Sequence, residues 1–265
     1  VGHDLHGFSE EDHPLHEFLK KETPNSNPVL ETIEQIDLAI GEILTKVPKN
    51  ANVICFSIHG MGANYTDMLS MLFLPELLYR FSFPGLAAIG FNESGVAPKS
   101  PITNPFRHSW LGEVWARNYG TSPIDKILRP LLPPQLLGKD NNGLACPFPL
   151  LKKGDPLAWM PARWYAPKWS QMKAFALPAF NDGHIRINLK GREANGIVEP
   201  SEYDEICKEI TEWLYEIKDA RTNKPIVKRV IRTRQSPLAS DEKLCDADLV
   251  VIWHEHPTDV VESPK

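Results

Sequence analysis

One stretch of this sequence is too patterned to be a generic loop: Phe180-Asn-Asp-Gly-His-Ile-Arg-Ile-Asn-Leu-Lys-Gly-Arg-Glu-Ala-Asn-Gly-Ile-Val-Glu-Pro200. Within it, residues 185–189 alternate apolar and polar side chains, which is typical of a half-exposed strand. Downstream, apolar residues recur at helical spacing and predict a helix over residues 203–217. Two further apolar runs, at residues 225–232 and 247–253, predict strands. Strands and helices therefore alternate, as in an α/β protein.

The segment upstream repeats this alternation. Between Val29 and Val47 the apolar residues are separated by steps of four and three, so the spacing predicts an amphipathic helix that Pro48 ends. Val53 to Phe56 is a continuous apolar run, which favours a strand covered on both faces in a parallel sheet. A second helical pattern begins near Met68. The predicted fold is thus α/β, with a mainly parallel central sheet flanked by helices.

A change of composition marks the middle of the chain. Prolines are dense between residues 83 and 167, and the aromatic residues there have no period. We interpret this segment as an insertion, with short helices near residues 111–119 and 123–132, inside a single domain over residues 1–265. A long irregular segment in a compact domain is often a lid or cap over a site, although a linker or packing arm fits the pattern equally well.

The charge and the cysteine content of the chain argue against several classes of protein. The 265 residues carry a net charge of -5 without a dense basic stripe, which argues against a nucleic-acid partner. The four cysteines lack the spacing of a zinc finger, so we expect reduced thiols and a cytoplasmic protein. No apolar run is long enough to span a bilayer, and the first residues do not form a signal peptide. Because the chain starts without Met, close to a candidate metal motif, we expect it to be part of a longer protein.

Histidine and carboxylate side chains gather at two places. Asp12 and His16 belong to an N-terminal histidine cluster, and both residue types suit Zn²⁺ or a similar divalent ion. His59 lies in a glycine-flanked loop after the predicted strand at residues 53–56, an edge where α/β sheets bind ligands. A structural histidine bonded to a nearby carbonyl is the equal alternative for His59.

Three residues could contact an anionic ligand. Lys190 and Arg192 flank Gly191, and an Arg side chain presents a planar fork of donors to phosphate or sulfate. The amide of Asn64 could reach the same ligand from the loop that holds His59. The alternatives are structural: Arg192 pairs with Glu193 or Glu199, and Asn64 caps the next helix. The residue pattern favours these structural roles.

The runs at residues 57–62 (Ser-Ile-His-Gly-Met-Gly) and 180–200 together resemble the alkaline phosphatase superfamily. The resemblance is to type I phosphodiesterase/nucleotide pyrophosphatase-like proteins, within the predicted phosphohydrolase/phosphomutase group, and extends over nearly the whole chain. It implies a metal-dependent hydrolase of small-molecule phosphate, phosphodiester or sulfate esters, with zinc, or alternatively manganese, as the cofactor.

The same resemblance implies site residues. Asp12 and His16 match an upstream Asp-x-x-x-His motif of metal ligands, and His59 matches the histidine of an Asp-His-Gly motif. Ile58 stands where the family has the Asp of that motif, so a degenerate site is implied. The family's nucleophile would lie before Val1 and a last His ligand beyond Lys265. We therefore expect this chain by itself to be inactive and its metal to be absent or weakly held, the competing hypothesis being a non-catalytic relative that binds an anion or a protein.

Overall fold

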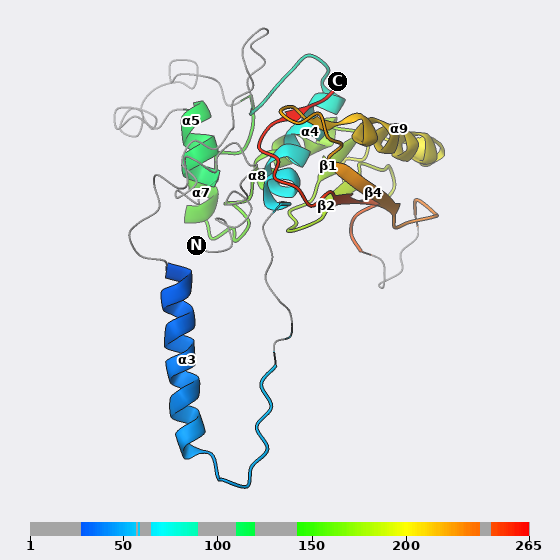
Figure 1. Ribbon diagram of the computed structural model, residues 1–265. Coiled ribbons are helices and arrows are strands. Elements are labelled where there is room, and N and C mark those ends of the chain that lie inside the picture. Colours follow the sequence, from blue (N-terminus) through cyan, green and yellow to red (C-terminus); the bar gives the residue numbers. More distant parts are fainter. Residues whose placement is uncertain are drawn as a thin grey trace, which may run out of the picture. The chain divides into compact units, whose positions relative to one another are not determined.

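The computed structural model describes residues 28–56, 58, 65–89, 110–119, 142–238 and 245–264. The chain divides into two compact units, Val1–Asn64 and Tyr65–Lys265 (Figure 1). A single domain over residues 1–265 stays a prediction. None of the described helices combines the length and apolar character needed to cross a membrane.

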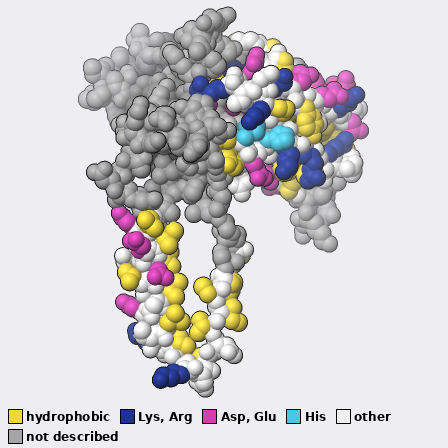
Figure 2. Space-filling model, viewed as in Figure 1, with side chains coloured by type: hydrophobic (Ala, Val, Ile, Leu, Met, Phe, Trp, Pro, Cys, Tyr) yellow, Lys and Arg dark blue, Asp and Glu magenta, His cyan; other side chains and the backbone are white. Residues whose placement is uncertain are grey.

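The described part of the first unit consists of one helix and an extended segment. Helix α3 (Pro28–Lys46) confirms the predicted helix and begins with a proline, which is tolerated in the first turn because no intrahelical N–H is needed there. Its apolar side chains are exposed, and they form a stripe beside acidic residues in Figure 2. The exposed apolar residues of α3 are Leu30, Ile33, Ile36, Leu38, Ile40, Ile43 and Leu44.

The prediction of a buried strand at Val53 to Phe56 is wrong for the described residues. These residues form no strand, and Ile54 and Phe56 are 82% and 80% exposed. A strand needs a hydrogen-bonded neighbour, and no described strand pairs with this segment. A short apolar run predicts that its residues can be buried, but it does not identify the element that would cover them.

The second unit contains helices and strands in a mixed α/β arrangement (Figure 1). Its helical segments are η1 (Met68–Phe73), α4 (Leu74–Ser82), η2 (Leu111–Trp115), α5 (Ala116–Tyr119), α7 (Pro147–Lys152), α8 (Pro161–Trp164), η4 (Ala166–Gln171), η5 (Pro200–Glu202) and α9 (Tyr203–Glu216). Its strands are β1 (Ala174–Ala176), β2 (Gly183–Ile187), β3 (Lys218–Asp219), β4 (Val227–Arg232), β5 (Leu249–Trp253) and β6 (Val261–Glu262).

Most of the predicted elements of this unit are present. The helix predicted from Met68 onward corresponds to η1 and α4, and the predicted helix at residues 203–217 corresponds to α9. Strands β2, β4 and β5 occupy the three runs predicted to be strands. In the proline-rich segment, η2 and α5 confirm the short helix near residues 111–119, whereas the predicted helix at 123–132 lies outside the described residues.

The main sheet has the strand order β1-β2-β5-β4, and every neighbouring pair in it is antiparallel. Strands β3 and β6 form a second, two-stranded antiparallel sheet. Among the described residues, the one parallel pairing is the isolated bridge between Leu189 and Val198. The mixed α/β class is thus confirmed, while a parallel central sheet is not among the described strands and stays a prediction.

Side-chain alternation in β2 and β5 creates one buried face. Ile185 and Ile187 of β2 are fully buried, and the residues between the buried positions of both strands are only partly covered. Gly183 belongs to the same face, where a Cβ would come within 2.7 Å of Leu74 Cδ2 and 2.9 Å of Trp253 Cζ2. The absence of a side chain at Gly183 therefore lets α4 approach the sheet closely.

Two hydroxyl groups attach helices to this sheet. The Ser70 hydroxyl of η1 donates to the Asn181 carbonyl and accepts from Trp253 Nε1, with both distances 2.7 Å. At the edge strand β4, the Tyr215 hydroxyl of α9 accepts from the Val230 backbone N–H at 3.0 Å. Figure 1 shows α9 beside β4 and α4 beside β1.

Candidate functional site

The predicted metal ligands Asp12, His16 and His59 lie outside the described residues, as does Asn64. Their roles therefore stay predictions. Ile58, which replaces the carboxylate of the family motif, is described and is 91% exposed. Its hydrocarbon side chain offers no donor atom to a metal ion. Among the residues that the structure describes, no three His, Cys, Asp or Glu side chains are grouped closely enough to hold one.

Lys190 and Arg192 are described, and they lie in the loop that follows β2. Asn188 fixes the base of this loop, because its carbonyl accepts from the Ile197 and Val198 N–H groups, both at 2.9 Å. Gly191 has a φ of 80°, a left-handed conformation that favours glycine. A Cβ on Gly196 would lie 2.1 Å from the Leu189 carbonyl oxygen, so the two sides of the loop touch at backbone level.

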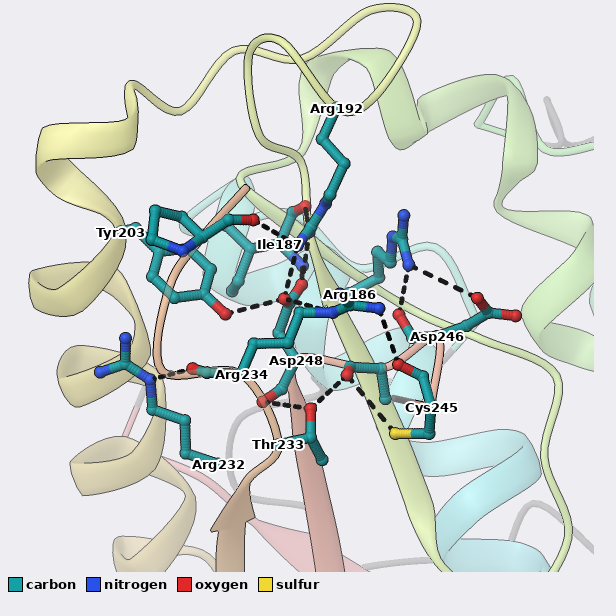
Figure 3. Close-up of polar contacts among 12 residues, drawn as sticks. Arg186, Ile187, Arg192, Tyr203, Arg232, Thr233, Arg234, Cys245, Asp246 and Asp248 are labelled. Atoms are coloured by element: carbon teal, nitrogen blue, oxygen red, sulfur yellow. Dashed lines mark hydrogen bonds and ion pairs between the residues drawn. The ribbon is translucent and has the colours of Figure 1, made fainter. Parts of the chain in front are cut away.

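Arg192 turns away from solvent and binds a carboxylate on the neighbouring strand segment. Its Nη1 donates to Asp248 Oδ1 at 2.7 Å, and its Nη2 donates to Asp248 Oδ2 at 2.6 Å (Figure 3). Asp248 immediately precedes β5 and its side chain is fully buried, while the Arg192 side chain is 12% exposed. This planar, two-pronged geometry is the one that guanidinium and carboxylate groups form most strongly.

The remaining N–H groups of Arg192 also have acceptors. Nε donates to Glu193 Oε1 at 2.8 Å, so the ion pair between Arg192 and Glu193 is present. Nη1 additionally reaches the Pro237 carbonyl at 3.2 Å, and Nη2 reaches the Ile187 carbonyl at 2.8 Å. A guanidinium has five N–H donors, and each of them has a protein acceptor here. An anion could bind Arg192 only by displacing one of these partners.

Asp248 is the centre of a larger cluster. Besides Arg192, its Oδ1 accepts from the Tyr203 hydroxyl at 2.7 Å, and its Oδ2 accepts from the Ile187 backbone N–H at 2.7 Å. The Nε of Arg234 lies 3.7 Å from Oδ1. The cluster joins β2, the start of α9, β5 and the segment after β4 (Figure 3). A buried carboxylate needs such partners, because an unpaired buried charge is strongly destabilising.

Burial and charge shift the ionisation of the groups around Asp248. Burial, followed by the hydrogen bond to Asp248 and its negative charge, raises the pKa of Tyr203 well above the ordinary tyrosine range. Burial alone lowers the pKa of Arg192, but the hydrogen bonds and charges of Asp248 and Glu193 together outweigh this effect and raise it. The phenol therefore stays protonated and the guanidinium charged, so both remain donors to Asp248.

Lys190 behaves differently from Arg192. It pairs with Glu199 across the loop, and the side chains of both residues are 50% exposed. The hydrogen bond to Glu199, followed by its negative charge, raises the pKa of Lys190. Because the ammonium group is accessible and exposed ion pairs are weak, Lys190 can exchange Glu199 for another anion at little cost.

Two more arginines border the cluster. Arg186 of β2 donates from Nε to Glu193 Oε1 at 2.7 Å. Arg232 of β4 donates to Asp204 Oδ1 at 2.5 Å, and its guanidinium carbon lies 4.9 Å from the centre of the Tyr203 ring. Each of these two positive charges has an acidic partner, and the contacts add to those that hold β2, β4 and α9 together.

The sequence pattern identified Arg192 as a candidate site residue but did not identify its partner Asp248. Asp248 lies inside the apolar run at residues 247–253, and an acidic residue inside a buried run signals a paired buried charge. That signal was available in the sequence. The role of Tyr203 was not, because an aromatic residue on the apolar face of a helix has the same pattern whether or not its hydroxyl is bonded.

Comparison with protein-family models, with curated proteins and with solved structures gave no match to this chain.

Proposed function

We propose that this chain is part of a metal-dependent hydrolase that cleaves small-molecule phosphate, phosphodiester or sulfate esters. The observation that supports the proposal most is the combination of Asp12-x-x-x-His16 with His59 in the glycine-flanked run at residues 57–62. In this proposal Asp12, His16 and His59 hold divalent metal, zinc or alternatively manganese. The proposed fold is the alkaline phosphatase type, whose central sheet is mainly parallel.

In such enzymes a bound metal ion stabilises the negative charge that develops on the oxygens around the reacting phosphorus or sulfur. In the loop after β2, Lys190 is suited to orient an anionic ester, because its side chain is half exposed and its partner Glu199 is exposed as well. Arg192 is proposed to act on substrate only through the loop shape that its pairing with Asp248 maintains. Because Ile58 stands where the motif has a carboxylate, the remaining ligands do not fit a complete two-ion site.

A non-catalytic relative that binds an anion or a protein partner is the second candidate. Two observations favour it: Ile58 supplies no metal ligand, and all five donors of Arg192 are occupied by protein acceptors. In that case the fold would be kept while the metal chemistry is lost.

The deciding experiment is an assay of the full-length gene product. It should be tested with p-nitrophenyl phosphate, bis-p-nitrophenyl phosphate and p-nitrophenyl sulfate, each with added Zn²⁺ or Mn²⁺. We expect hydrolysis of at least one ester, and a fall by orders of magnitude in His59→Ala but not in the control variant His254→Ala. Silence on all three esters, from a protein that melts cooperatively, would establish the non-catalytic alternative.

A further inference from the structure

A second buried carboxylate, Glu76 of α4, joins its helix to parts of the proline-rich segment. Glu76 is 6% exposed. Its Oε1 accepts from Arg80 Nε at 2.8 Å and from the Ala88 backbone N–H at 3.1 Å. Its Oε2 accepts from the Ile89 backbone N–H at 2.9 Å and from the Tyr165 hydroxyl at 2.5 Å. One side chain thus contacts its own helix and two segments distant in the chain.

A further set of contacts extends this arrangement. The Ala88 carbonyl accepts from the Tyr119 hydroxyl and from Asn142 Nδ2, the latter at 3.3 Å. The aromatic rings of Tyr79 and Tyr165 lie 5.8 Å apart between their centres, which closes the region from the side of α4. We call the residues joined in this way the Glu76 cluster; they are Glu76, Ala88, Ile89, Tyr119, Asn142 and Tyr165.

The members of the Glu76 cluster belong to both ends of the proline-rich segment. Ala88 and Ile89 follow its beginning at residue 83, and Tyr165 precedes its end at residue 167. Tyr119 and Asn142 come from described parts between these ends. The polar contacts that link these distant parts include those to the Glu76 carboxylate and the Ala88 carbonyl. Asn142 Nδ2 also donates to the Ala87 carbonyl at 3.2 Å, and the Ala145 N–H donates to the Trp164 carbonyl at 2.7 Å.

Burial makes these contacts sensitive to the charge of Glu76. Tyr165 is 1% exposed, and burial, followed by the charge of Glu76, raises its pKa well above the ordinary range, so its hydroxyl stays a donor. Four donors point at the carboxylate. An amide in its place has one acceptor oxygen and presents an NH₂ group to donors, so buried N–H groups would lose their acceptor, which costs free energy.

The sheet is held by a different set of contacts. Asp248 bonds to groups on β2, α9 and the loop after β2, and none of the hydrogen bonds described for Glu76 involves these residues. We propose that the Glu76 cluster is a separate cooperative unit: when the Glu76 carboxylate loses its partners, both ends of the proline-rich segment detach together while the β2-β5-β4 sheet stays folded.

Native-state hydrogen exchange of the intact chain, followed peptide by peptide, tests whether the Glu76 cluster is a separate cooperative unit. In Glu76→Gln we expect amides at residues 86–89 and 162–165, which represent the two ends of the segment, to exchange about tenfold faster or more, with residues 249–253 unchanged. Asp155→Asn is the matched control, because Asp155 lies in the same proline-rich segment and pairs with Arg163 at 2.9 Å outside the Glu76 cluster. It should leave residues 86–89 unaffected.

Two outcomes would overturn the proposal: equal acceleration across residues 86–89 and 249–253, or no acceleration at either place. If Glu76→Gln does not fold, Tyr165→Phe replaces it, since this change removes one donor and keeps both backbone contacts of the carboxylate. Its expected pattern is the same with a smaller acceleration, and uniform acceleration in Tyr165→Phe would again refute a separate unit.

Discussion

Arg192 and Asp248, which are 56 residues apart in the chain, form a two-pronged ion pair whose N–O distances are 2.7 and 2.6 Å. The carboxylate has no exposed surface. The pair connects the loop after β2 to the start of β5, so the conformation of that loop depends on a contact with a distant part of the sheet.

Asp248→Asn should destabilise the second unit by about 3–5 kcal/mol, because it removes the fully buried carboxylate of the two-pronged pair and leaves the Arg192 charge with Glu193. Urea unfolding followed by tryptophan fluorescence measures this effect. All 7 tryptophans lie beyond residue 64, so the signal reports the second unit alone. The control Lys190→Ala breaks an exposed pair and should cost about 1 kcal/mol or less. A loss in Asp248→Asn as small as that of the control would mean that the buried pair contributes little.

Gly183→Ala should destabilise the same unit by about 1–3 kcal/mol through overpacking, because the added Cβ would meet Leu74, Trp253 and Val251 within 3.2 Å. Gly112→Ala is the matched control. A Cβ at Gly112 has nothing within 4 Å, and its helical segment gains about 0.5–1 kcal/mol from replacing glycine. Thermal unfolding of the two variants should therefore shift in opposite directions. Shifts in the same direction would show that α4 and the sheet adapt more easily than their spacing indicates.

The four thiols should differ in reactivity. Cys55 and Cys245 are exposed, whereas Cys207 is buried, and burial raises the pKa of the Cys207 thiol to about 11. At pH 8 a disulfide reagent should label Cys55 and Cys245 quickly and Cys207 only on unfolding, since the thiolate is the reactive form. Mass spectrometry of labelled peptides identifies the sites. Rapid labelling of Cys207 in folded protein would contradict its burial on the inner face of α9.

Stability should fall at alkaline pH. The pKa of Tyr203 is raised in the folded state above its ordinary value of 10.0, so the unfolded chain releases this proton first. Its contribution is complete below about pH 10 and is lost as the pH rises from there toward the folded-state pKa. Urea midpoints at pH 8 and pH 10.5 should therefore differ more in the unchanged protein than in Tyr203→Phe. Equal differences would assign the alkaline loss to other groups.

Divalent metal should bind this chain weakly. The proposed ligand set of Asp12, His16 and His59 lacks the carboxylate that Ile58 replaces, and zinc sites need about four ligands. Calorimetric titration with Zn²⁺ provides the measurement, with His254→Ala as the control for nonspecific histidine binding. Tight one-to-one binding that His59→Ala abolishes and His254→Ala keeps would show that the chain completes its own site.

Local patterns in the sequence predicted β2 and α9, because one face of each is buried and leaves a period of 2 or 3.6 residues, and β5, because its residues form a continuous apolar run. They did not reveal the antiparallel pairing of β2 with β5, since periodicity describes a strand's own faces and not its neighbour. The same limit explains the wrong strand at Val53 to Phe56. An apolar run without a partner among the described strands stays extended and exposed.

The candidate site was predicted in part. The ion pair of Arg192 with Glu193 follows from two adjacent opposite charges, whereas its pairing with Asp248 depends on a contact across the sheet. The buried role of Glu76 could not be predicted for a similar reason. In the helical pattern of α4 it resembles a solvated charge, and only the return of residues 88, 89 and 165 to the same place turns it into a buried acceptor.

The position of β5 in the sheet has a consequence for synthesis of the chain on the ribosome. β5 lies between β2 and β4 but comes after both of them in the sequence. Until residues 249–253 emerge, β2 and β4 each present an unpaired edge. The hydrogen bond between Ser70 and Trp253 also cannot form before then, because the two residues are 183 positions apart. The sheet must therefore assemble late, and a nascent chain stalled before Leu249 would expose two adhesive strand edges that chaperones or proteases recognise.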